Sequence, residues 1–172
     1  MTPKEIVAKI AHSLDNSEPI VGEPSDSYLT RLREAVAPLL LHIPYDETGE
    51  VHNLIALIRL EATYLTRYGE AFPKPTRVGA YDKTIDDNAT AVVHARTKAV
   101  HKAKCADRAT YETVRQETTQ FVLSVVADTW VRKLQDANSI YTEVSPKDLI
   151  SHLEERCTGR HALDLSSLFK SG

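Results

Sequence analysis

The sequence contains few of the features that disulfide scaffolds, exported precursors and membrane spans require. Its 172 residues include only two cysteines, Cys105 and Cys157, which argues against a disulfide scaffold and fits a reducing compartment. Charged residues interrupt the apolar N-terminus, so we expect no signal peptide. The longest uncharged runs, such as residues 35–45, are too short to span a bilayer and contain prolines. We therefore expect a soluble, cytoplasmic protein with no membrane partner.

A strong excess of either charge is also missing. The 21 Lys and Arg residues against 24 Asp and Glu residues give a net charge of −3, which excludes a bulk polyanion-binding protein of the histone kind. Any contact with nucleic acid must then come from a local patch. The composition, 42% hydrophobic and 26% charged, is that of one globular domain over residues 1–172 that can bury its own core.

Glycine and proline are absent from a long central part of the sequence. No proline occurs over residues 76–145 and no glycine over residues 80–158, and these residue types are the strongest helix breakers. The apolar spacing predicts a long Ala-rich helix, or a helical hairpin broken near residues 107–110, over about residues 86–134. Because the first half of this stretch is Ala-rich, a partner can approach more closely there than along the β-branched and aromatic second half.

Two helices are expected before the first turn-rich loop, which covers residues 43–49. A capping-box pattern at residues 2–5 starts an N-terminal helix within residues 1–19, which we expect to be loosely attached. A second helix begins at Ser25 or Asp26, and Pro38 either kinks or restarts it.

The remaining expected helices flank a proline-stiffened linker over residues 70–85. An amphipathic helix that includes Leu54 precedes the linker and ends at Gly69. Residues 145–148 start a later helix that Gly159 ends, and a short final helix follows it. Strand signals are nearly absent. The sequence therefore predicts an all-α, multi-helix bundle with proline-rich connections.

A basic segment is the strongest candidate for a binding surface. Five cations lie close together with only Asp107 opposing them: Arg96, Lys98, Lys102, Lys104 and Arg108. Helical periodicity places a polar stripe opposite the alanine face: His94, Lys98, His101, Cys105 and Arg108. The segment either contacts phosphates or an acidic partner, or is the solvated outer face of a bundle helix. The absence of interleaved aromatic residues and the negative overall charge favour the solvated face.

Two histidine–cysteine pairs have the spacing of zinc ligands on a helix. These are His101 with Cys105 and Cys157 with His161. However, cations would surround a metal ion at the first pair, and the second pair crosses the helix end expected at Gly159. We therefore predict no metal site. The lone histidines are expected on helix surfaces or partly buried: His42, His52 and His152.

No pattern in the sequence indicates catalysis. The carboxylate pairs at residues 46–47 and 86–87 are explained as turn and N-cap residues. Neither a nucleophile elbow nor a glycine-rich phosphate-binding loop is present. We therefore expect no enzyme activity, no cofactor and no small-molecule substrate.

A series of short motifs carries a family resemblance. The motifs are IPYDE at 43–47, VHNLI at 51–55, FPKP at 72–75, AYD at 80–82, DTWVRKL at 128–134, YTEVSP at 141–146 and GRHALD at 159–164. In this order and spacing, they resemble the N-terminal half of the Gag-like polyprotein of copia-type LTR retrotransposons, in the form found in algae and diatoms. The resemblance covers about residues 20–165 and leaves the first helix unmatched.

The resemblance implies a helical capsid-type protein that self-assembles into a homo-oligomeric particle around element RNA and has no active site. Family chains continue past the equivalent of residues 162–164 into a second helical half, and often into a cysteine–histidine knuckle that binds RNA. This sequence contains neither part. It is therefore expected to be a fragment, a degenerate copy or a capsid-like domain used by a host, with weak RNA binding. The alternative is a nucleic-acid-binding or adaptor helical module that acts through residues 96–108.

Overall fold

The computed structural model describes most of the chain: Glu5, Ala8, Lys9 and His12, then residues 25–41, 43, 52–81, 90–138, 140, 141 and 143–170, with side chains up to residue 159. Its elements, in chain order, are α2 (Asp26–Leu41), η1 (Leu54–Leu57), α3 (Glu61–Tyr68), α4 (Ala91–Val125), α5 (Asp128–Val131), η3 (Arg132–Leu134) and α6 (Pro146–Lys170). Because the described residues form helices and connections without a strand, the predicted all-α class is confirmed.

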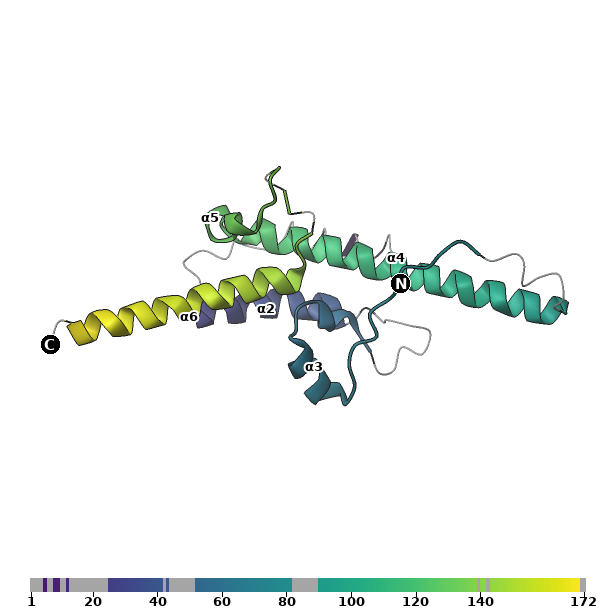
Figure 1. Ribbon diagram of the computed structural model, residues 1–172, viewed down its shortest axis with the longest axis horizontal. Helices are drawn as coiled ribbons and strands as arrows, with labels where there is room; N and C mark the ends of the chain where they lie inside the picture. Colours follow the sequence, from purple (N-terminus) through teal and green to yellow (C-terminus); the bar gives the residue numbers. More distant parts are fainter. Residues whose placement is uncertain are drawn as a thin grey trace.

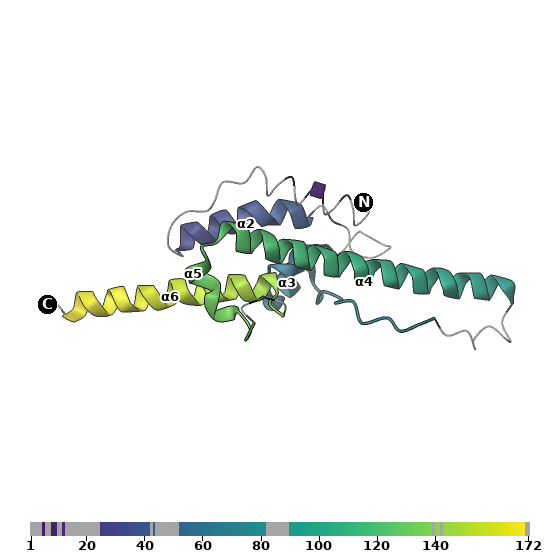
Figure 2. The ribbon, with the colours of Figure 1, turned by 90° about the horizontal axis from the view of Figure 1, so that it is seen from above.

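Two long helices extend from a central body in opposite directions (Figure 1, Figure 2). In the body, α6 packs against α2, α4 and α5, and η1 packs against α2 and α4. Burying a large apolar side chain stabilises a fold by about 1.5–3 kcal/mol. The fully buried core therefore holds these elements together, and its members include Leu32 and Leu40 of α2, Leu54 and Ile55 of η1, Val114 and Val122 of α4, and Leu149 and Leu153 of α6.

Helix α2 begins where the sequence predicts. The Ser25 hydroxyl accepts a hydrogen bond from the backbone N–H of Tyr28 at 3.2 Å, which is the geometry of an N-cap. The helix then continues through Pro38 to Leu41, so the predicted restart at Pro38 is wrong. Val36 and Leu40 are buried on either side of this proline, and their packing supports the helix where Pro38 removes a backbone hydrogen bond.

The expected amphipathic helix around Leu54 is divided into two elements. Residues 54–57 form the tight turn η1, which Asn53 caps by accepting a hydrogen bond from the N–H of Ile55. All of residues 54–58 are buried, and a straight amphipathic helix cannot bury five consecutive side chains on one face. Helix α3 therefore starts again at Glu61, and Gly69 ends it at φ +79°, as predicted.

Helix α4 is continuous over 35 residues, so the alternative of a hairpin broken near residues 107–110 is wrong. Its N-cap is Thr90, and the helix starts at Ala91 rather than near residue 86; the predicted caps Asp86 and Asp87 lie outside the described residues. It ends at Val125 rather than near residue 134 because the chain turns there and carries its apolar residues into α5 and η3.

Helix α6 starts where the sequence predicts, and its first turn forms a capping box. The Asp148 carboxylate accepts hydrogen bonds from the N–H and the hydroxyl of Ser145, and the Ser145 hydroxyl accepts one from the N–H of Asp148. The predicted end at Gly159 is wrong, because a single helix runs through it to Lys170. A mid-helix glycine costs about 1 kcal/mol relative to alanine, which is too little to stop a helix with good formers on both sides.

Candidate functional site

The N-terminal half of α4 stands outside the body. We call residues 91–108 the α4 arm, and at 1.5 Å per residue it is about 27 Å long. No residue of the arm is buried, whereas Tyr111, Val114 and Phe121 of the following half are. The arm exposes three valines, with 78% of Val92, 49% of Val93 and 46% of Val100 accessible. Close packing was predicted along this half of the helix, but the half extends beyond the body and exposes its apolar side chains (Figure 1).

The five cations predicted as a patch divide into two groups. Arg96, Lys98, Lys102 and Lys104 are exposed along the arm. Arg108 is half-buried at its base, where its guanidinium donates a 2.9 Å hydrogen bond to the Pro75 carbonyl and pairs with Glu112 at 2.9 Å. The exposed group remains available for an external partner, while Arg108 joins the arm to the body.

The polar stripe of the arm faces the extended segment that follows α3. The Tyr81 ring meets the His101 ring edge-on, with 5.4 Å between centroids, and Lys98 Nζ lies 5.9 Å from the Tyr81 centroid. Together with the hydrogen bond from Arg108 to Pro75, these ring contacts place residues 75–81 along the arm. The segment runs antiparallel to α4 (Figure 2). Tyr81 lies outside the basic segment in sequence, so the pattern of residues 96–108 alone does not show this aromatic neighbour.

The two cysteines lie in different surroundings. Cys105 is exposed on the arm, with its Sγ 3.6 Å from Nε2 of His101. Cys157 is buried in α6 and donates a 3.5 Å hydrogen bond to the Asp26 carboxylate. Desolvation and then this carboxylate raise the pKa of the Cys157 thiol. In the described part of the chain, no three His, Cys, Asp or Glu side chains are grouped so that they could hold a metal ion.

A cluster of aromatic rings connects α3 to α4. His52, expected at a surface or partly buried, is buried: its Nδ1 lies 3.0 Å from the Tyr64 hydroxyl and its Nε2 3.3 Å from a Glu70 oxygen. Tyr64 packs edge-on against Phe72, and Phe72 stacks on Tyr111 with 6.1 Å between centroids. His152 is half-buried, and His42 is outside the described residues.

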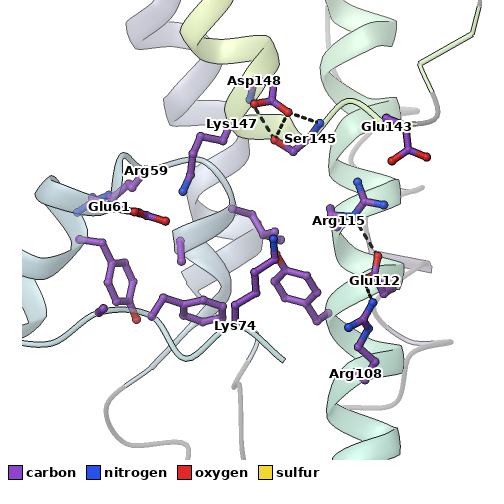
Figure 3. Close-up of a pocket in the computed structure, with 16 residues that line it drawn as sticks. Arg59, Glu61, Lys74, Arg108, Glu112, Arg115, Glu143, Ser145, Lys147 and Asp148 are labelled. Carbon is purple, nitrogen blue, oxygen red and sulfur yellow. Dashed lines mark hydrogen bonds and ion pairs between the residues drawn. The ribbon is translucent and has the colours of Figure 1, made fainter. Parts of the chain in front are cut away.

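A cavity of about 640 Å³ opens beside this cluster, between η1, α3, α4 and the start of α6 (Figure 3). No sequence pattern predicts this cavity, because its residues come from four separate segments of the chain. Its aromatic lining is Tyr64, Phe72 and Tyr111. Its charged lining is Arg59, Lys74, Arg108, Arg115 and Lys147, with Glu61, Glu112, Glu143 and Asp148.

Comparisons with protein-family models, with curated proteins and with solved structures found no match to this chain. The Gag-like resemblance therefore rests on its sequence motifs. Among the described helices, none has both the length and the apolar composition needed to cross a bilayer.

Proposed function

We propose that this protein is a non-catalytic, self-associating structural protein of the capsid-like, Gag-like type. The observation that supports this proposal is the α4 arm, which holds an apolar face outside the body and borders it with cations. Exposed apolar patches rimmed by polar residues are typical of protein–protein contacts. The occupant that we propose for this face is the body of a second copy.

The distribution of charge supports a second copy as the partner. The arm contains five Lys and Arg residues and one Asp residue, so its charge is +4. Because the net charge of the whole chain is −3, the residues outside the arm together carry −7. The excess acidic residues lie in sequence at residues 15–23, 46–50 and 82–87, so the arm of one copy is attracted to these acidic segments of another copy. Two different surfaces meet in such a contact, and contacts of this head-to-tail kind form rings or extended assemblies.

Sedimentation velocity over a range of protein concentration tests this proposal. We expect species larger than a monomer at low salt and smaller species at high salt, because salt screens the attraction between the arm of one copy and the acidic segments of another. Replacing Val93 and Val100 by Glu should abolish association without unfolding the protein, since both side chains are half exposed. The matched control is Ile140→Glu, which changes an equally exposed apolar residue away from the arm. A strict monomer at every concentration and salt would contradict the proposal.

A second candidate function is weak binding of RNA through Arg96, Lys98, Lys102 and Lys104. The observation in its favour is that the four cations are exposed on one rigid helix, with the Tyr81 ring beside Lys98. Replacing Lys98, Lys102 and Lys104 by Glu should remove RNA binding and its dependence on salt. For single strands, each phosphate contact lowers the logarithm of the binding constant by about 0.7 per tenfold increase in salt concentration. No RNA binding by the unchanged protein at low salt would exclude this function.

A further inference from the structure

The cavity between α3, α4 and α6 has the size of a small-molecule site. Its volume of about 640 Å³ lies within the range of about 300–1,000 Å³ that such sites occupy. One part of its wall is apolar, from Ala56, Leu57, Phe72 and Tyr111, and the rest of the lining includes five cations and four carboxylates. This combination of an apolar wall and convergent charges is typical of ligand pockets.

Two of the carboxylates in the cavity already have partners within the protein. Glu112 lies between two arginines, with its Oε1 2.9 Å from Arg108 and its Oε2 3.0 Å from Arg115. Asp148 accepts hydrogen bonds from Ser145 as part of the α6 capping box. Neither carboxylate therefore neutralises the other cations of the cavity.

Three cations of the lining, Arg59, Lys74 and Lys147, form no ion pair with a described residue. In Figure 3, Lys147 enters the cavity from α6 and Lys74 enters it from the opposite side. The Glu61 carboxylate ends on the Lys147 side of Arg59 in this view, and the Glu143 carboxylate is directed away from the two lysines. Lys74 and Lys147 therefore offer the cavity two ammonium groups that form no ion pair with a described carboxylate.

We propose that this cavity binds a nucleoside phosphate. The phosphate lies between Lys74 and Lys147, where two ammonium groups approach it from opposite sides. The base lies against the apolar wall formed by Phe72 and Tyr111, since a planar ring packs well on aromatic side chains. This site is separate from the exposed face of the α4 arm, so its failure would leave the proposal of self-association untouched.

Isothermal titration calorimetry of the whole chain with AMP, and with inorganic phosphate as a second probe, tests the site. We expect AMP to bind and inorganic phosphate to bind about tenfold more weakly, because it makes no contact with the apolar wall. Lys74→Glu and Lys147→Glu should each weaken AMP binding about tenfold or more, since each removes a charged hydrogen-bond donor. The control, Lys133→Glu, makes the same change of charge on an exposed lysine outside the cavity and should leave the affinity unchanged.

Amide chemical shifts of the unmodified protein give a readout that needs no variant. On addition of AMP, the shifts should change around Lys74, Tyr111 and Lys147 and stay constant along residues 91–104 of the arm. The proposal is overturned if AMP does not bind, or if the shift changes lie elsewhere. It is equally overturned if AMP and inorganic phosphate bind with the same affinity, or if Lys133→Glu weakens binding as much as the cavity variants do.

Discussion

Residues 91–108 and 109–125 of α4 share one uninterrupted backbone helix but have opposite surroundings. The second part buries Tyr111, Val114 and Phe121 in the core, and the first part exposes Val92 and Val93. A short isolated helix is marginal in water because its nucleus is costly to form. The packed half supplies that nucleus, and the arm only has to extend it. One helix can therefore anchor a fold at one end and present a rigid surface at the other.

The largest difference between the packed half of α4 and the arm should appear in the free energy of unfolding when a side chain is shortened in each. Phe121→Ala should lower the free energy of unfolding by about 3–5 kcal/mol, because it leaves a cavity in the core. Val100→Ala on the arm should change it by less than about 0.5 kcal/mol. Urea denaturation followed by circular dichroism measures both values. Equal losses would show that the arm is buried in the folded protein.

The starts of α6 and α4 allow a comparison of helix capping in the body and at the arm. Ser145→Ala should cost about 1 kcal/mol, because it removes a reciprocal capping box beside the core. Thr90→Ala removes a longer contact of 3.5 Å at the exposed start of α4, so it should fray the first turn and leave global stability nearly unchanged. Thermal unfolding of both variants tests the difference, and a larger loss for Thr90→Ala would contradict it.

A glycine in the arm should act locally. Ala99→Gly lowers helix propensity by about 1 kcal/mol, and no core packing compensates for the loss. Amide hydrogen exchange should therefore become faster within residues 91–105, while exchange in the packed half and the urea midpoint stay the same. Faster exchange along the whole of α4 would mean that the two parts unfold as one unit.

The smallest effect expected within the body concerns Tyr28. Its side chain is fully buried, and its hydroxyl forms no hydrogen bond with a described residue. Burial raises the pKa of Tyr28 above the ordinary value of 10.0. The unfolded chain then loses its proton first, so stability is complete below pH 10 and falls as pH rises through the folded pKa. Tyr28→Phe should make this alkaline loss shallower and leave stability at neutral pH unchanged or slightly higher. Denaturation midpoints measured above and below pH 10 check both expectations, and an identical alkaline loss in the variant would contradict them.

Local sequence signals predicted the parts of the fold that depend on local chemistry. The helix start at residues 145–148 and the glycine cap at Gly69 follow from backbone hydrogen bonding and φ alone. The division at η1 and the continuation of α6 through Gly159 were missed, because tertiary burial and a long helix outweigh local propensity there.

The candidate site was predicted only in part. The exposed cations of the arm belong to one stretch of sequence, so their proximity along the chain was enough to group them. The contact of Tyr81 with Lys98 joins residues 17 positions apart. The cavity brings together Arg59, Lys74 and Lys147 from three separate parts of the chain. Such groupings arise from how helices pack, and one sequence contains no periodicity that reveals them.

Hydrogen exchange of the α4 arm, followed by mass spectrometry at low and high protein concentration, tests the central claim most directly. If the arm is the surface through which copies associate, exchange in peptides covering residues 91–108 slows as concentration rises and becomes fast again at high salt. The same peptides of the variant in which Val93 and Val100 are replaced by Glu should exchange rapidly at every concentration. Exchange in the arm that does not depend on concentration, in a protein that sedimentation shows to associate, would contradict the claim.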